Sequence, residues 1–333
     1  MTAKARIGVV GAGLMGAEIA FVHALEGHDV LLADRTADAL AQAVERLGAT
    51  HDKGAARGHY DAAAKEAVLG RIRTTTELKD FFDRDVVVEA VFEREDVKAE
   101  VLRALDAACR DGCLIATNTS TIPITVLASH VGEGRRPRFV GTHYFSPVSR
   151  MKLVEVIPGA ETSEETVAEA TALCAAVGKQ PIRVKDVTGF AVNRLLHVMM
   201  IEAVRLVEEG VASPEDIDLA CRLGLGHPMG PFELMDATTS SLCLQAQQIM
   251  FDAYGERFRP RPLLKQRGAA LFASRPRGHW VDLLEGSDAC FAPVLSIDEA
   301  VDHPHNKARG IYHRTGAGAV QARAAPRFSA LES

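Results

Sequence analysis

One glycine-rich stretch near the start of the chain constrains the fold more than any other feature. The β-branched run RIGVV stops at GAGLMG, and a segment with helical periodicity, AEIAFVHALEG, follows directly. This pattern predicts a strand, a tight turn and a helix. Gly11 would permit the turn, Gly13 would let a pyrophosphate approach bare backbone, and Gly16 would let the helix pack closely on the strand. Free N–H groups at the helix start would then bind the phosphates.

An acidic residue follows where a dinucleotide-binding fold needs one. Residues 28–33 read as a second strand, and Asp34 ends it. A carboxylate at this position accepts hydrogen bonds from an adenosine ribose and repels a 2′-phosphate, so the sequence predicts NAD rather than NADP as the cofactor. The alternative is a plain turn followed by a surface aspartate. That alternative does not explain why strand, glycines, helix and acid all occur at the spacing of a dinucleotide-binding motif.

Length and charge exclude several classes of protein. The chain has 333 residues, which suggests about two domains, and a formal charge of -6, which offers no basic field for nucleic acid. Its six cysteines include no CxxC pair, as is typical of reduced thiols in a cytoplasmic protein. No segment reads as a signal peptide or a membrane span. We therefore expect a cytoplasmic location, with neither nucleic acid nor membrane as partner.

Strands and helices alternate along the first part of the chain. After Asp34 and a long Ala-rich helical stretch, four further segments read as strands: 85–92, 114–117, 139–143 and 152–157. Such alternation predicts an α/β fold with a doubly wound sheet, whose ligands gather at the carboxyl ends of strands. Near Asp186 the pattern changes to helices only.

The expected domain organisation follows from this change of pattern. We expect a Rossmann-type NAD-binding domain at 1–187, an all-α domain at 188–268 and an atypical tail at 269–333. The segments 190–207 and 242–250 carry more apolar surface than a small helical domain can bury. The helical domain is therefore expected to form a homodimer. It is also the expected substrate domain.

Polar residues near the strand ends are candidates for chemistry. Hydride transfer from an alcohol carbon needs a base for the hydroxyl proton, and histidine suits that role near neutral pH. His143 ends one strand, and Glu155 lies inside another, apolar strand, where a buried carboxylate needs a partner such as an imidazole. Spacing alone fits a core histidine and a solvent-facing glutamate equally well. Ser120 and Asn193 suit a substrate oxygen, although such residues also cap turns and helices.

The central part of the chain carries five specific motifs: VVVEAVFE, ATNTSTIPIT, GTHYFSPVSRMKLVEVI, GFAVNRLL and HPMGPFELMD. Together they resemble the short-chain 3-hydroxyacyl-CoA dehydrogenase family, the NAD-dependent enzymes of fatty-acid β-oxidation, over residues 6–267. The resemblance implies oxidation of an (S)-3-hydroxyacyl-CoA to the 3-oxoacyl-CoA. It implies His143 as catalytic base and Glu155 as its partner, with Ser120 and Asn193 as ligands of the substrate oxygen.

The glycine motif and the resemblance together define the expected binding residues. The expected cofactor contacts are Gly11, Gly13, Leu14, Met15, Gly16, Asp34, Glu93, Lys98, Ser120 and Ser146. Ser146 stands where many members of the family carry asparagine. Lys53, near the end of the long helical stretch, is the expected contact for the acyl-CoA substrate.

The carboxyl end of the chain departs from this family. The Gly-Arg-Lys-x-Gly-x-Gly-Phe-Tyr run that closes its members is missing after RPLLK. From about Ala270, RPRGHWVDLLEGSDACFAPVLS, HPHNKARG and APRFS instead resemble the extreme end of class III CoA-transferases and α-methylacyl-CoA racemases. That segment excludes the catalytic region of those enzymes, so we expect no second active site. His303 and His305 lack ligand partners at metal-binding spacing, so no metal site is expected.

Two other functions fit parts of the sequence. A sugar-acid 3-dehydrogenase resembling lambda-crystallin would share the fold, whereas the basic positions and the long helical insert favour a CoA substrate. A non-catalytic dinucleotide- or acyl-CoA-binding protein, disabled by the exchanged tail, is the other alternative. The presence of His143, Glu155 and Asn193 favours an enzyme.

Overall fold

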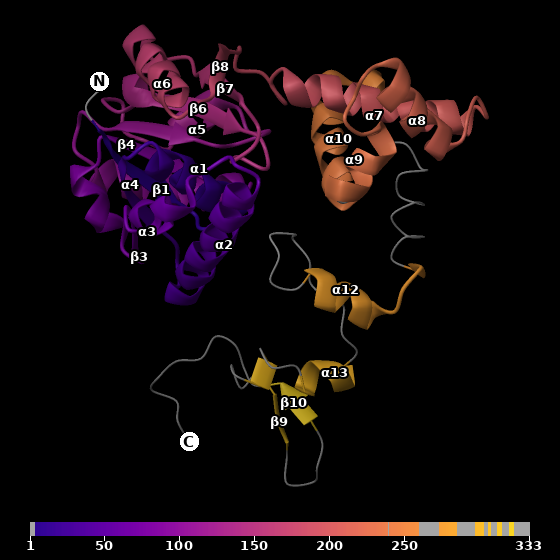
Figure 1. Cartoon of the computed structure of the whole chain (residues 1–333), viewed down its shortest axis with the longest axis horizontal. Coiled ribbons are helices and arrows are strands. Elements are labelled where there is room, and N and C mark those ends of the chain that lie inside the picture. The colour runs from indigo at the N-terminus through magenta and orange to yellow at the C-terminus, as the bar shows by residue number, and fades with distance from the viewer. Residues whose placement is uncertain are drawn as a thin grey trace. The chain divides into compact units, whose positions relative to one another are not determined.

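The computed structural model describes residues 4–238, 240–259, 273–284, 297–302, 306–307, 312–314 and 320–322. Backbone proximity divides the chain into two units, Met1–Ala269 and Ala270–Ser333. Figure 1 colours the chain from its amino to its carboxyl end. The candidate site lies in the first of these units.

An eight-stranded sheet of order β3-β2-β1-β4-β5-β6-β7-β8 organises the first unit (Figure 1). Its strands are β1 (Arg6–Val10), β2 (Asp29–Ala33), β3 (Ile72–Thr75), β4 (Val86–Glu89), β5 (Leu114–Thr117), β6 (Phe139–Tyr144), β7 (Leu153–Pro158) and β8 (Gln180–Arg183). The first six strands pair in parallel, whereas β7 runs antiparallel to β6 and β8 runs parallel to β7. The predicted doubly wound sheet is confirmed. The strands β3 and β8, which are short and mostly polar, and the reversal at β7 were not predicted.

Helices cover both faces of the sheet because apolar side chains alternate along its strands. Val9 and Val88 point into one core with α1 (Leu14–Leu25), α2 (Ala37–Ala56), α3 (Lys65–Leu69) and α6 (Glu164–Ala176). Val10 and Val87 point into the opposite core with α4 (Glu95–Ala108), α5 (Ile124–Ala128) and the 3₁₀ helix η2 (Leu78–Asp83). Two separate cores therefore fix the strand ends that carry the predicted site residues. Two shorter 3₁₀ helices are η1 (Ala62–Ala64) and η3 (Arg136–Arg138).

Helices follow the sheet in the remainder of the first unit. They are α7 (Val192–Glu208), α8 (Pro214–Gly224), α9 (Pro231–Thr238), α10 (Ser240–Tyr254) and the 3₁₀ helix η4 (Glu256–Phe258). Ser213 caps α8 by accepting a hydrogen bond from the Asp216 N–H, with proline at the first helical position. A core that includes Met200, Val204 and Phe232 holds α7, α8 and α9 together.

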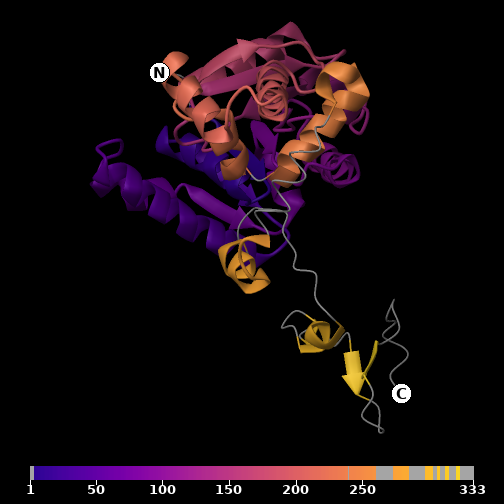
Figure 2. The same ribbon diagram turned by 90° about the vertical axis from the view of Figure 1, so that its right-hand side faces the viewer.

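The second unit contains four described elements. They are α12 (Arg277–Leu284), α13 (Ile297–Asp302), β9 (Tyr312–Arg314) and β10 (Val320–Ala322). The two strands pair in antiparallel fashion (Figure 2). In neither unit does a helix of described residues have the length and apolar character that crossing a bilayer requires.

Several histidines are buried without hydrogen-bond partners among the described residues. Both ring nitrogens of His23 and His51 and the Nδ1 atom of His197 lack one. Burial lowers the pKa of His23 to about 3, helped by the charges of His28 and Lys179. Burial also lowers the pKa of His197 to about 4. The folded protein therefore holds the imidazoles of His23 and His197 neutral at pH values where the unfolded chain protonates them.

This burial predicts a loss of stability in acid. Because the pKa of His23 is depressed in the folded state, its contribution is complete above about pH 6.5, the ordinary histidine value, and falls as the pH drops toward 3. We expect His23→Leu to flatten the dependence of the unfolding free energy on pH between about 5 and 7, measured by urea denaturation. His59→Leu, at an exposed position, is the control. An unchanged slope in His23→Leu would contradict this account.

Candidate active site

The glycine turn follows β1 at the point where the sheet order reverses, between β1 and β4. Gly11 has a φ of +102°, and a Cβ atom there would lie 2.5 Å from the Ala90 carbonyl oxygen. A Cβ atom on Gly16 would lie 1.9 Å from the Gly11 carbonyl oxygen. Gly13 is the N-cap of α1 and contributes no side-chain cap. The turn thus presents backbone and a helix N-terminus, which suits a pyrophosphate at a topological switch point.

Asp34 lies at the end of β2 and contacts the glycine turn directly. One of its carboxylate oxygens accepts a hydrogen bond from the Ala12 N–H at 2.7 Å, and the other accepts from the Arg35 N–H at 2.7 Å. The Arg46 guanidinium donates to the Ala12 carbonyl oxygen at 2.8 Å. Asp34 therefore helps to hold the turn, in addition to its expected role at the ribose.

Glu93 follows β4 and holds the loop after β5. Its Oε1 atom accepts hydrogen bonds from the Thr119 hydroxyl at 2.6 Å and from the N–H groups of Ser120 and Thr121 at 2.8 and 2.9 Å. Burial raises the pKa of the Glu93 carboxyl, but Lys98 and these donors outweigh it, so the net shift is downward. The ionised carboxylate therefore fixes the backbone that carries Ser120.

Lys98 is buried beneath the same loop, with only 1% of its side chain exposed. Its ammonium lies 2.8 Å from Glu89 Oε1, 3.3 Å from the Val91 carbonyl oxygen and 3.3 Å from Glu93 Oε2. An ammonium has three protons to donate, and these three acceptors match that number. In the structure Lys98 and Glu93 bind protein groups, and their contacts with the cofactor stay a prediction.

His143 and Glu155 face each other across the antiparallel pair formed by β6 and β7. His143 Nδ1 lies 2.8 Å from Glu155 Oε2, and both side chains are buried. Glu155 Oε1 accepts from the N–H groups of Ala191 and Val192 at 2.9 and 3.0 Å. Burial raises the pKa of the Glu155 carboxyl, but the hydrogen bonds from His143, Val192 and Ala191 lower it further than burial raises it. The sequence left two possibilities open, and the structure pairs these residues.

The Glu155 contact determines which nitrogen of the imidazole carries hydrogen. An ionised carboxylate only accepts, so Nδ1 must donate, and Nε2 of the neutral ring is then an acceptor. The Ser120 hydroxyl lies 3.1 Å from His143 Nε2 and donates to it. Asn193 reaches the same place from α7, with its Nδ2 atom 3.5 Å from the Ser120 carbonyl oxygen. The four predicted catalytic residues thus come together from β6, β7, α7 and the loop after β5.

A buried lysine that sequence reasoning missed holds the loop after β6. The Lys179 ammonium donates to the carbonyl oxygens of Val148 and Met151, the latter at 2.9 Å. From α1, Glu18 accepts a hydrogen bond from the Ser149 N–H at 2.7 Å. The role of Lys179 could not be predicted from the sequence, because both of its acceptors are backbone carbonyl groups, which every residue carries.

Ser146 and Lys53 take part in none of the hydrogen bonds described above. Ser146 is exposed in the loop after β6, and Lys53 is exposed in the last turn of α2. Lys53 borders a cavity of about 210 Å³ between α1 and α2, whose other lining residues include Leu14, Glu18, Arg46, Leu47 and Thr50. The predicted CoA-contacting lysine and α1, the helix that begins at the glycine turn, therefore line the same cavity.

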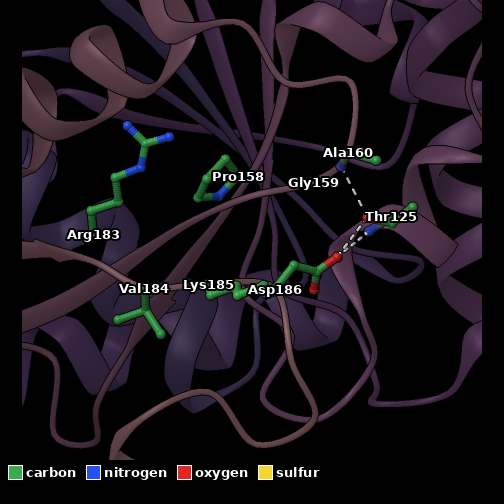
Figure 3. Close-up of a pocket in the computed structure, with 8 residues that line it drawn as sticks. All are labelled: Thr125, Pro158, Gly159, Ala160, Arg183, Val184, Lys185 and Asp186. Atoms are coloured by element: carbon green, nitrogen blue, oxygen red, sulfur yellow. Dashed lines mark hydrogen bonds between the residues drawn. The ribbon is translucent and has the colours of Figure 1, made fainter.

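A larger cavity, of about 410 Å³, lies at the ends of β7 and β8 (Figure 3). Asp186 borders it and caps α5, accepting from the N–H groups of Ile124 and Thr125 at 2.8 and 2.9 Å. None of the predicted site residues lines this cavity. Within the described ranges, no group of three or more His, Cys, Asp or Glu side chains is arranged to hold a metal ion. His303 and His305 lie outside those ranges.

Two family models match the first unit, and the second match continues beyond residue 269. Residues 6–187 match the family model of the 3-hydroxyacyl-CoA dehydrogenase NAD binding domain, and residues 189–280 match that of the C-terminal domain. The second match continues past residue 267, where the resemblance recognised in the sequence ended.

Individual relatives agree with these matches. The chain is 41% identical over 278 residues to a probable 3-hydroxybutyryl-CoA dehydrogenase of Deinococcus radiodurans, covering 82% of this chain and 98% of that protein. It is 40% identical over 267 residues to the mitochondrial hydroxyacyl-coenzyme A dehydrogenase of Sus scrofa, covering 78% and 84%.

Among solved structures, the (S)-3-hydroxybutyryl-CoA dehydrogenase from Ralstonia eutropha has a TM-score of 0.77 and 36% sequence identity, covering 81% of this chain and 95% of that one. The tail's resemblance to CoA-transferases stays a prediction. The matched domains span most of the chain and include the glycine turn, Asp34 and the His143–Glu155 pair. The chain therefore belongs to the 3-hydroxyacyl-CoA dehydrogenase family, whose members use NAD.

Proposed function

We propose that this chain oxidises an (S)-3-hydroxyacyl-CoA to the 3-oxoacyl-CoA, with His143 as the base for the hydroxyl proton. The observation that carries the proposal is the buried contact of 2.8 Å between His143 Nδ1 and Glu155 Oε2. It leaves Nε2 free of hydrogen and directed at the Ser120 hydroxyl, 3.1 Å away. A histidine held in this tautomer can take a proton at Nε2, and the carboxylate stabilises the charge that results.

The residues around the glycine turn fit the expected cofactor. Side chains are excluded at Gly11 and Gly16 because a Cβ atom would strike backbone oxygen, so only backbone faces the phosphates. Gly11, Gly13, Leu14, Met15, Gly16 and Asp34 would hold NAD. When bound, NAD supplies the hydride acceptor. Ser120 and Asn193 would orient the substrate oxygen toward His143, which is the protein's contribution to positioning.

The substrate assignment rests on the relatives and on one basic position. The relatives reported above carry names of CoA-thioester dehydrogenases. Lys53 borders the cavity next to Leu14, which supports its proposed contact with an anionic acyl-CoA. A sugar-acid dehydrogenase would not need a lysine at this cavity to bind CoA. A non-catalytic binding protein would not need a buried base paired with a carboxylate.

Loss of absorbance at the NADH band with acetoacetyl-CoA tests the activity. Steady turnover with acetoacetyl-CoA, and none with a sugar acid as the oxidised substrate, supports the proposal. Binding of NADH without turnover would instead support a non-catalytic role. Turnover with the sugar acid alone would favour the other dehydrogenase class.

We further propose a cytoplasmic homodimer that uses the helical part of the first unit. Large apolar side chains are exposed on α7, on α8 and next to them, including Leu195 at 76%, Leu223 at 79%, Leu225 at 66% and Val211 at 63%. Such a surface costs free energy in water unless a second copy covers it. The five described cysteines, Cys109, Cys113, Cys174, Cys221 and Cys243, are free thiols, which supports the cytoplasmic proposal.

Replacing the proposed base should reduce turnover without removing cofactor binding. We expect His143→Gln to lower kcat by about 10²- to 10⁴-fold, the usual effect of losing a general base, with NADH affinity nearly unchanged. The measurements are steady-state kinetics and titration of NADH fluorescence. His130→Gln, outside the candidate site, is the matched control. Near-normal turnover in His143→Gln would remove this residue from the mechanism.

Removing the negative partner should change the pH dependence of catalysis. In Glu155→Gln a protonated imidazole loses its stabilising charge, so protonation of the base requires a lower pH. We therefore expect the acid limb of the pH–rate profile to move to lower pH, together with a reduced kcat. An unmoved acid limb would mean that Glu155 has no electrostatic influence on the base.

Cofactor preference should depend on Asp34. Asp34→Ala should weaken NADH binding more than NADPH binding, because only the carboxylate discriminates against the 2′-phosphate. Loss of the hydrogen bond to the Ala12 N–H affects both cofactors, so the ratio of the two dissociation constants is the informative quantity. Asp38→Ala, in the first turn of α2, is the control. Equal losses for the two cofactors would count against the assignment.

The proposed dimer has a direct test in light scattering. We expect a mass near twice the 35.8 kDa of the chain, and Leu223→Glu should shift the protein toward the monomer. Ile182→Glu alters an exposed apolar residue on β8 and should leave the mass unchanged. A concentration-independent monomer in the unmodified protein would reject the dimer.

A further inference from the structure

Phe190 occupies an unfavourable backbone conformation next to the His143–Glu155 pair. Its φ is +47°, and it is the one non-glycine residue with positive φ in the described part of the chain. This left-handed region is unfavourable for a bulky L-residue, and it persists only where surrounding contacts impose it. Phe190 lies in the turn between β8 and α7, and its side chain is buried.

The Phe190 ring packs near the imidazole of His143. The two ring centroids lie 5.6 Å apart with an interplanar angle of 55°, and a second ring, Phe145, lies 4.5 Å from the same imidazole. His143 therefore has polar contacts at both nitrogens, to Glu155 and Ser120, and aromatic contacts besides. Aromatic rings at these distances exclude water and restrict rotation of the imidazole.

The same turn also supplies both backbone donors to the carboxylate. The Phe190 N–H donates to the Val187 carbonyl oxygen at 3.0 Å, and the next two N–H groups, of Ala191 and Val192, reach Glu155 Oε1. One turn thus places a ring against the base and two N–H groups on its partner. The backbone conformation of Phe190 therefore determines both where its ring lies and where the next two N–H groups point.

Contacts from α10 hold this turn in place. Gly189 has a φ of +72°, and a Cβ atom there would lie 1.7 Å from Met250 Cε, so the turn approaches α10 closely. The Tyr254 hydroxyl donates to the Thr188 carbonyl oxygen at 2.8 Å. The Arg194 guanidinium lies 4.3 Å from the centroid of the Tyr254 ring. These contacts can impose the conformation that Phe190 would not adopt by itself.

We propose that Phe190 is a positioning residue for the His143–Glu155 pair. Its ring orients and shields the imidazole, and its left-handed backbone directs the N–H groups of Ala191 and Val192 onto Glu155. This inference rests on the proposed role of His143 as base. A residue that only fills the core would affect stability alone.

The test compares Phe190 with a buried phenylalanine of the same core cluster. Phe81 belongs to that cluster and is fully buried, so Phe81→Leu is the matched control for the loss of a ring. We expect Phe190→Leu to lower kcat by about 10- to 100-fold, with less than a twofold change in the Michaelis constant for NADH, as for misplaced catalytic groups. Phe81→Leu should lower the melting temperature by a similar amount and leave kcat unchanged.

A spectroscopic readout separates this inference from the proposed activity. The proton on His143 Nδ1, bound to Glu155, should give a low-field ¹H NMR resonance that is absent in His143→Gln. Phe190→Leu and Phe190→Gly should broaden or shift that resonance through exchange with water, and Phe81→Leu should preserve it. Glycine relieves the backbone strain, so Phe190→Gly isolates the contribution of the ring.

The outcomes distinguish the two ideas. A protein without turnover whose resonance is still perturbed by Phe190→Leu would refute the proposed activity and support the positioning role. Turnover and resonance that are both unchanged in Phe190→Leu and Phe190→Gly would overturn the positioning role while leaving the activity intact. Equal effects of Phe81→Leu and Phe190→Leu on kcat and on the resonance would also overturn it.

Discussion

The carboxylate of Glu155 is the charge on which the candidate site depends. It is fully buried, and an isolated carboxylate in such a place would be strongly unfavourable. The protein compensates the charge with an imidazole from β6 and two N–H groups at the start of α7. One buried charge therefore connects the sheet to the first helix of the part that follows it. The hydrogen bonds of Glu155 thus serve two purposes: they hold the proposed base His143, and they join the two matched domains.

A second set of buried charges supports the loop that carries Ser120. Glu89 and Lys98 pair at 2.8 Å at the carboxyl end of β4, and Lys98 also contacts Glu93. Glu93 in turn holds the N–H groups of Ser120 and Thr121. Breaking a buried pair of this kind is costly because it leaves an uncompensated charge. The position of Ser120 thus depends on Glu93, which binds its N–H group, and on Lys98, which binds Glu93.

The sequence predicted those parts of the structure in which side-chain identity and backbone geometry are closely linked. The glycine turn is such a case, since Gly11 and Gly16 occupy places where any Cβ atom would strike an oxygen. The sheet was predictable where strands are apolar and continuous, but the short polar strands β3 and β8 resemble loops in sequence. The His143–Glu155 pair could be suggested but not established, because its register depends on the direction of β7.

Other contributions had no sequence signal. The donors to Glu155 Oε1 and the acceptors of Lys179 are backbone groups, which every residue carries, so only the fold selects them. The left-handed conformation of Phe190 likewise occurs in a turn that residues distant in the sequence contact. Local preference would place glycine or asparagine there. Sequence reasoning fails at this turn because long-range contacts override local preference.

The reversal of direction at β7 has a consequence for how this protein can vary in length. His143 and Glu155 are directly opposed in the ladder between β6 and β7, so their separation is fixed by strand pairing and not by the connecting loop. Insertions in that loop can change its size without moving either residue, provided that the pairing register is kept. A slip of one position would place Val154 or Val156 opposite His143 and turn Glu155 to the other face. The pairing register therefore positions His143 and Glu155, whereas the hydrogen bonds from Lys179 and to Glu18 hold the connecting loop separately.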